Sequence, residues 1–469
     1  MSRPLFLFVL SLVAAPFFLC ADDAAAPEPM GLGKCIAHAM KHSQTLHMAA
    51  IDLDTKQLQT IIQRAVFDFE FNYTGKADVD AQSVGHDASL KKRIVGGFDA
   101  TVSTGLEDDR EGTGDASYVT LKLSKKLLGT DSTFFSTRKS IEDSLTEELK
   151  TLNELHRQRR EVAYRVTAAF YQVIRNLQSK TVVERSLARA RRNLENAIER
   201  EKPLDISTAR IQVPDNELSL LKAERSIANG LDTLKVIMGM PVAQSLNILS
   251  EFQFTIAKTD IRIDTGFAMD NFETLINNRL DDRKLRGDVR IAKQELWPDL
   301  NASVTQGWDT ASDSHNFRGG DDSLLFSLGL SWKLGRRKDR AEWRKKINSL
   351  RRNSRNWSLL SERKRQKLFD LSRQLDERAR NIDLQRRKIA LVTRQVELYV
   401  DRYENGEIDI LEFIRSQNDL ENAKVESIKL ETSYMELLAS YYYEVGRWPV
   451  PGVSEPDDNA PPPQGPPVD

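Results

Sequence analysis

The chain contains very little cysteine and carries almost no net charge. Of its 469 residues, two are cysteine, 68 are lysine or arginine and 69 are aspartate or glutamate. This balance argues against a nucleic-acid-binding protein, which carries a basic surplus on its binding domain. Aromatic residues make up 7% and charged residues 29% of the chain. Such a composition is typical of long solvated helices rather than of one thick globular core.

Long hydrophobic runs are missing after the N-terminus. The first 21 residues, MSRPLFLFVLSLVAAPFFLCA, combine an arginine, an apolar run and a final small residue. They predict a secretory signal peptide that is cut after Ala21, which leaves Cys35 without a disulfide partner. Lipidation of Cys20 is the alternative, although the preceding FFL fits a lipoprotein cleavage box poorly. We expect the exported chain either to be soluble or to cross a membrane as strands.

Motifs for catalysis and metal binding are also missing. The sequence has no HExxH, no GxSxG and no Walker-type glycine loop, so it predicts neither an enzyme nor a cofactor. His38 and His42 stand four apart, with His47 nearby, but no acidic or cysteine partner lies at a useful spacing. We interpret these histidines as part of a solvated helix face and predict no metal site.

Four stretches alternate apolar and polar residues with period two, which predicts strands with one apolar face. They are FDFEFNY from Phe67, VTLKLSK from Val119, LNASV from Leu300 and FSLGLSWKL from Phe326. The strands form two pairs, and the connection in the first pair, residues 82–116, leaves room for an extra hairpin. A half-exposed soluble sheet would show the same pattern, because the strand signal of a membrane barrel is weak.

A very long helix is predicted after each strand pair. Residues 132–201 and 337–404 contain almost no glycine or proline, and about 70 helical residues span roughly 100 Å. The second of these helices has apolar residues at every seventh position, namely Leu368, Leu375, Ile382, Ile389, Val396 and Tyr403. This sustained period predicts coiled-coil packing against partner helices.

The order of helix, strand pair and helical hairpin occurs twice. The returning segments DNELSLLKAE and QNDLENAKVE match at Asn, Leu, Lys and Glu, and they end at the similar stops MGMP and VGRWP. We infer an internal duplication, with repeats at residues 22–241 and 266–449 and a linker or equatorial segment at residues 242–265. The Pro-rich residues 450–469 are predicted to be a disordered tail.

Taken together, these features resemble the TolC-like outer-membrane efflux protein family. The resemblance covers about residues 30–449 and rests on the order and spacing of CIAHAMKHSQTLHMAAIDLDTKQLQ, LKLSKKLLG, VTAAFYQVI, WPDLNASV, LSWKLGRRKDRAEW, YENGEIDILEFIRSQNDLENAK and YYYEVGRWP. It implies a mainly α chain of long antiparallel helical hairpins with four strands. Four strands cannot close on themselves, and the resemblance implies a homotrimer with a twelve-stranded outer-membrane β-barrel above a periplasmic helical tunnel.

The same resemblance implies a passive conduit without enzymatic activity. Such a channel exports the substrates of an inner-membrane transporter, in tripartite efflux or type I secretion, and a periplasmic adaptor protein is its second partner. Outer-membrane lipid surrounds the barrel, and no nucleic acid is involved. The alternative functions are a periplasmic adaptor and a structural coiled-coil protein of the cell envelope. An adaptor normally has one hairpin and a lipoyl-like domain, and a coiled coil would leave the four strands unexplained.

An acidic tip surrounds Gly406, between the last two helices. Asp409 and Glu412 stand three apart, so we expect them to share one helix face, and three copies would form a carboxylate ring that favours cations. The resemblance places Tyr403 and Glu412 at the tyrosine and first aspartate of the family's entrance constriction, and Arg415 at its second aspartate. These five residues are the predicted periplasmic entrance or gate. A solvated turn is the alternative, because the helix dipole favours acids at a helix start.

Arg415 lies three residues beyond Glu412 on the same predicted face. It could pair with Glu412 of its own chain or of a neighbouring chain and hold the mouth shut. The alternative is that Arg415 only lowers the negative charge of the ring.

Two segments depart from the family pattern. The first hairpin tip, EREKPLDISTARIQVPDNEL, has no glycine, and Pro214 is predicted to kink or delay the returning helix. The stretch at residues 279–298 is about two helical turns shorter than the resemblance implies. These departures concern the symmetry of the tunnel and the contact surface of the first tip rather than the fold.

Overall fold

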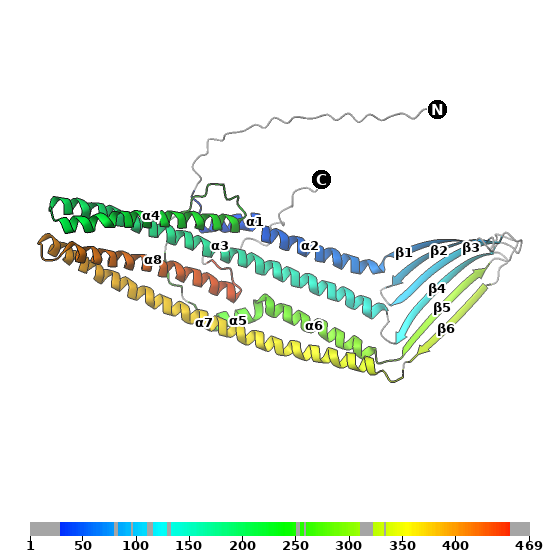
Figure 1. The fold of residues 1–469 in the computed structure, drawn as a ribbon. Helices are drawn as coiled ribbons and strands as arrows, with labels where there is room; N and C mark the ends of the chain where they lie inside the picture. Colours follow the sequence, from blue (N-terminus) through cyan, green and yellow to red (C-terminus); the bar gives the residue numbers. More distant parts are fainter. Residues whose placement is uncertain are drawn as a thin grey trace, which may run out of the picture.

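The computed structural model describes residues 29–78, 83–94, 97–109, 116–128, 133–249, 254–257, 259–309, 322–332 and 334–450. The predicted signal peptide, Cys20 and all but the first residue of the predicted tail lie outside these ranges. The described part is elongated, with a sheet at one end and the tips of two helical hairpins at the other (Figure 1).

The sheet consists of six antiparallel strands that follow one another in sequence order. They are β1 (Phe69–Asp78), β2 (Ser83–Ile94), β3 (Phe98–Asp109), β4 (Ala116–Leu128), β5 (Asp299–Asp309) and β6 (Asp322–Ser331). The predicted fold class is confirmed, but the number of strands is corrected from four to six. The hairpin of β2 and β3 lies within residues 82–116, the connection in which the sequence left room for an extra hairpin. Its alternation is weak because His86, Lys92 and Thr104 interrupt its apolar face.

The helices extend away from one end of this sheet (Figure 1). They are α1 (Leu32–His42), α2 (Gln44–Arg64), α3 (Thr133–Glu199), α4 (Pro203–Met238), α5 (Ile261–Asn271), α6 (Glu273–Gln294), α7 (Arg337–Glu404) and α8 (Ile410–Val445), with one 3-10 turn, η1 (Ala65–Phe67). The two long helices, α3 with 67 residues and α7 with 68, have the predicted length. None of the described helices combines the length and the apolar character that a membrane span requires.

Two helical hairpins, α3 with α4 and α7 with α8, lie side by side (Figure 1). The seven-residue seam of α7 is confirmed, because Leu368, Leu375 and Ile382 are at most 3% exposed and join one buried cluster with Tyr434 and Leu438 of α8. Closer to the tip, the seam residues are only half-buried until Tyr403. The hairpins are therefore held by packing of regularly spaced apolar side chains.

Buried polar groups fix the middle of the molecule, where α5 and α6 pack on the long helices. The Tyr441 hydroxyl of α8 donates to an oxygen of Asp264 at 2.7 Å, and Lys364 lies 2.6 Å from Glu444. Burial lowers the pKa of Lys364 to about 8, although Glu444 opposes this shift. These pairs satisfy charges that would otherwise destabilise the helix packing.

The first hairpin tip turns without glycine. Glu201 takes the left-handed conformation, with φ of 54°, at the position where a glycine would be expected. Pro203 occupies the first turn of α4, where its fixed φ favours the start of a helix. The predicted delay at Pro214 is therefore wrong, since α4 begins before this residue and runs through it.

The seam of α7 predicts a strong response to charge. Leu375→Asp places a carboxylate in a position that is 3% exposed, and we expect a loss of about 3 kcal/mol or more of stability. Ile389→Asp, at a half-buried position, should be milder. The melting temperature of the purified protein measures both effects. Gln374→Asp, on the exposed neighbour, is the control, and equal melting of Leu375→Asp and this control would show that the seam was misassigned.

Candidate functional site

The tips of the two hairpins meet in a small apolar cluster of their own. It consists of Ala197, Ala209, Tyr403, Ile410, Phe413 and Ile414. Higher up, Asn193 of α3 donates from its side-chain amide to Gln417 of α8 at 3.0 Å, and Arg189 pairs with Glu421. The predicted entrance is therefore built from both hairpins and not from the second tip alone.

Tyr403 lies inside this cluster. It is 6% exposed, and its ring stacks on Phe413 with centroids 4.9 Å apart and an angle of 7° between the planes. The guanidinium of Arg200, from the first tip, lies 4.3 Å above the ring, and its Nη1 donates to the Tyr403 carbonyl oxygen at 3.0 Å. Burial raises the pKa of Tyr403. In the single chain, this tyrosine joins the two hairpins.

Arg200 and Phe413 were missed by the sequence analysis. Each lies within a tip segment that the sequence analysis quoted, but nothing in either segment indicates that the first tip reaches the second. Arg200 and Tyr403 are about 200 residues apart in the chain, so no local sequence pattern indicates that they are in contact.

Gly406 ends α7 in a left-handed conformation with φ of 76°. The Gly406 N–H donates to the Tyr403 oxygen at 3.1 Å, and the Glu407 N–H donates to the Arg402 oxygen at 2.9 Å. These two bonds form the Schellman motif that commonly closes a helix, and glycine adopts its conformation without strain. The side chains of Arg402 and Glu407 also pair at 3.2 Å. Gly406 is thus required by the backbone of the tip.

Asp409 is the N-cap of α8. Its side chain accepts a hydrogen bond from the Glu412 N–H at 2.8 Å, and its own backbone is extended. The side chains of Asp409, Glu412 and Arg415 are all exposed. No ion pair joins Glu412 to Arg415 among the described residues of this chain. A clamp within one chain is therefore not formed, and one Asp409 oxygen is already engaged by the helix.

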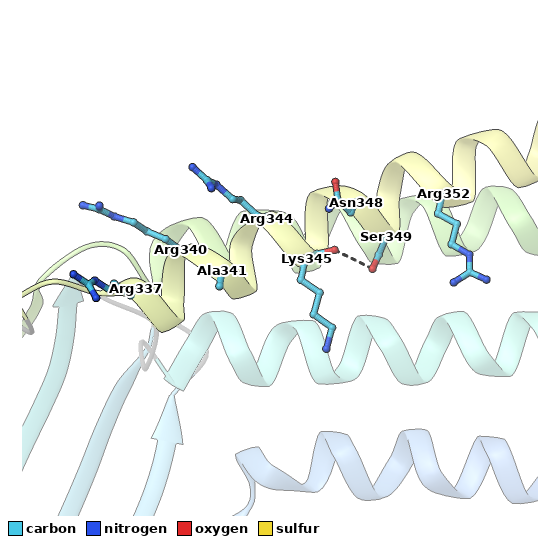
Figure 2. Close-up of a pocket in the computed structure, with 8 residues that line it drawn as sticks. All are labelled: Arg337, Arg340, Ala341, Arg344, Lys345, Asn348, Ser349 and Arg352. Carbon is cyan, nitrogen blue, oxygen red and sulfur yellow. Dashed lines mark hydrogen bonds between the residues drawn. The ribbon is translucent and has the colours of Figure 1, made fainter.

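A second charged region lies at the opposite end of α7. Residues 336–367 contain fourteen basic and three acidic side chains, a surplus that the sequence analysis did not single out although a local count reveals it. An open groove of about 700 Å³ is lined there by four arginines and Lys345. Figure 2 shows Arg337, Arg340 and Arg344 projecting to the same side of α7. No carboxylate lines this groove, so its surface is strongly positive.

Two histidines of α1 lie side by side. The rings of His38 and His42 lie 4.4 Å apart, and the described residues contain no group of three potential metal ligands. Burial lowers the pKa of His38, with a contribution from His42. Cys35 is fully buried, and burial raises its pKa to about 11.

A sheet joined to two long helical hairpins is also the fold of several solved outer-membrane proteins. VceC of Vibrio cholerae has this fold, with a TM-score of 0.66 and 14% identity over 89% of this chain and 96% of that chain. The open state of MtrE from Neisseria gonorrhoeae gives a TM-score of 0.67 with 13% identity over 89% of each chain. A membrane protein of Pseudomonas aeruginosa gives 0.68 with 15% identity over 89% and 91%. Such identities establish the fold.

The sequence also matches a family model in the second half of the chain. Residues 268–440 match the family model described as outer membrane efflux protein. The predicted resemblance to the TolC-like outer-membrane efflux proteins is thereby confirmed, by sequence in this segment and by fold over most of the chain. This is a family of channels and not of enzymes. No curated protein sequence matches the chain.

The cap of α8 can be tested by removing its acceptor. Asp409→Ala deletes the bond to the Glu412 N–H, and we expect a local loss of about 1 kcal/mol, or roughly fivefold faster hydrogen exchange in the first turn of α8. Asp409→Asn keeps an acceptor at the cap and should exchange at nearly the original rate. If both variants exchange alike, the side chain of Asp409 does not hold this helix start.

Proposed function

We propose that this chain is the outer-membrane channel-tunnel component of a tripartite efflux or type I secretion system. In this role it conducts substrates passively from an inner-membrane transporter across the periplasm and the outer membrane. The observation that carries the proposal is a sheet with one apolar and one polar face that continues directly into helices about 100 Å long. The family match supports the same function.

The two faces of the sheet differ throughout its width. One face carries Phe71 on β1 and Phe326 on β6, which are 68% and 70% exposed, and the strand register continues this face across β2 to β5. The opposite face carries polar residues such as Ser303 and Ser327, whose hydroxyls bond at 2.6 Å. An apolar outside and a polar inside are what a strand wall needs between lipid and water.

Aromatic residues mark one boundary of the apolar face. Trp297 precedes β5 and Trp332 follows β6, both at the end of the sheet where the helices begin, and both are more than half exposed. Indole rings favour the interface between lipid and water. This position supports a membrane around the sheet with its boundary where the helices begin.

Assembly from several copies follows from the exposed edges. β1 and β6 are the two edge strands of the described sheet, and open edges are not tolerated in lipid. The outer helices also expose apolar residues at every seventh position, on α4 at Leu204, Ile211 and Leu218 and on α7 at Leu384, Leu391 and Leu398. Figure 1 shows α4 and α7 on opposite sides of the paired hairpins. A ring of copies brings these stripes together, and we propose a homotrimer.

The hairpin tips are the proposed periplasmic entrance, where an adaptor and an inner-membrane transporter would dock. Asp409, Glu412 and Arg415 are exposed at this end, whereas Tyr403 and Gly406 build the turn itself. In a trimer, six carboxylates from Asp409 and Glu412 would surround the opening and favour cations. We also propose the division of the chain into two repeats, residues 22–241 and 266–449, that the sequence predicts.

The trimer predicts that the exposed leucine stripe is an interface. Leu391→Asp changes a residue that is 72% exposed in the single chain, so the helices should stay folded while the trimer dissociates. Light scattering and circular dichroism in detergent measure the two properties. Ala390→Asp is the control, because Ala390 is exposed but lies beside the stripe. A folded monomer of the unaltered protein would contradict the assembly.

The acidic entrance predicts cation preference in single-channel recordings on planar bilayers. Asp409→Asn combined with Glu412→Gln removes the charges while asparagine still caps α8, and we expect the reversal potential in a salt gradient to shift towards zero. Unchanged selectivity would mean that these carboxylates do not face the pore.

Arg415→Ala separates the two roles considered for this arginine. Conductance should rise if Arg415 clamps the mouth through Glu412 of a neighbouring chain. If Arg415 only lowers the charge of the ring, cation preference should strengthen while conductance stays the same.

A further inference from the structure

We infer that three copies of this chain close an eighteen-stranded barrel, because the β2–β3 hairpin is an integral part of the membrane wall. The exit duct is then wider than the twelve-stranded barrel that the family resemblance implied. A wide exit admits polypeptide-sized cargo, so any selection by size falls to the helical tips. The inference rests on the proposed trimer.

The two strands of the hairpin pair with their outer neighbours over ten of their twelve residues each. Ten residue pairs join β1 to β2, twelve join β2 to β3 and ten join β3 to β4. No register shift interrupts these three ladders, whereas one lies between β4 and β5 at Lys126 and Leu128. If β2 and β3 packed on the face of the sheet, β1 and β4 would pair with each other. In the structure, β2 and β3 lie between β1 and β4.

The apolar face continues through the hairpin. The register aligns Phe71, Leu90, Val102 and Leu121 in one row across β1 to β4, and all four side chains are at least 40% exposed. The adjacent row, on the opposite face, consists of Asn72, Ser89, Ser103 and Thr120. The hairpin therefore presents the same apolar outside and polar inside as the flanking strands, which a hairpin in water would not need.

The hairpin also reaches the same boundary as the other strands. The Lys92 Nζ of β2 lies 3.8 Å from the ring centroid of Phe69, and the Lys125 Nζ of β4 lies 4.2 Å from that of Phe98 on β3. All four residues stand at the helix end of the sheet, the end that Trp297 and Trp332 mark. Lysines that extend over aromatic rings are typical of a membrane interface. β2 and β3, with twelve residues each, are long enough to span it.

The width of the helical wall agrees with six strands. Four helices, α2, α3, α6 and α7, adjoin the sheet in each chain, and helices packed side by side occupy about 8 to 10 Å each, or about 36 Å in total. Strands 4.8 Å apart with a tilt near 40° occupy about 38 Å when there are six and about 25 Å when there are four. Six strands therefore continue the helical wall without a constriction.

The same geometry gives the size of the duct. Eighteen strands close at a backbone diameter of about 36 Å, against about 24 Å for twelve. Side chains fill about 5 Å on each side, which leaves openings of about 26 Å and about 14 Å. Barrels of 16 to 18 strands are known to leave an aqueous channel.

Single-particle imaging of the trimer in lipid nanodiscs tests the inference directly. We expect eighteen strands in the membrane ring. A variant in which a two-residue turn joins Asp78 to Ala116 removes the hairpin, and it should form twelve, because Phe71 and Leu121 already share a face. Twelve strands in the unaltered protein, with the hairpin outside the ring, would overturn this inference and leave the proposed function intact. The absence of a trimeric membrane ring would overturn both.

Cysteine accessibility gives an independent test in the bilayer. Leu90→Cys and Val102→Cys place thiols on the apolar face, and Ser89→Cys and Ser103→Cys place them on the polar face. A water-soluble maleimide should label the first pair roughly tenfold more slowly, since the reactive thiolate is disfavoured in apolar surroundings. The native Cys35 is buried, with its pKa raised to about 11, so it does not compete. Equal labelling of both pairs would place the hairpin in water and overturn the inference.

Discussion

An open sheet edge in lipid is the constraint on which the rest of this architecture depends. Each backbone N–H or C=O group that faces hydrocarbon without a hydrogen-bond partner destabilises the protein by roughly several kcal/mol. In lipid, the edge strands β1 and β6 therefore require neighbouring strands. Because one chain supplies a sheet that cannot close on itself, the proposed wall has to come from several copies. The positions of the long helices follow from those of the strands, since α3 comes after β4 and α7 comes after β6 in the chain.

The helical part meets a different requirement, which is to keep helices of more than 65 residues parallel over their whole length. Seam residues such as Leu368 and Ile382 provide regular packing in the upper and middle parts. Near the tip the seam is less buried, and the Arg200–Tyr403–Phe413 stack joins the hairpins there instead. The hairpin tips therefore combine an aromatic contact between the hairpins with exposed charges around it.

Much of this fold could be predicted because its signals are local and periodic. The seven-residue spacing in α7 and the period of two in β1, β4, β5 and β6 come from single segments, in which each residue's neighbours determine which face it joins. The sequence left room for the β2–β3 hairpin but did not count it among the strands, because Lys92 and His86 stand on its apolar face and weaken the contrast. The delay predicted at Pro214 was wrong because Pro203 had already started the helix.

The sequence by itself determined most of the elements, their order and the likeness to outer-membrane efflux proteins, since repeated periods and turn residues act over a few positions. It also placed Gly406 and Asp409 at a helix end and a helix start. Only the tertiary structure decided what these residues contact. It buried Tyr403 under an arginine from the other hairpin and engaged Asp409 as a cap. It also inserted two further strands into the sheet. Such contacts join segments far apart in the chain, and no local pattern encodes which partners will meet.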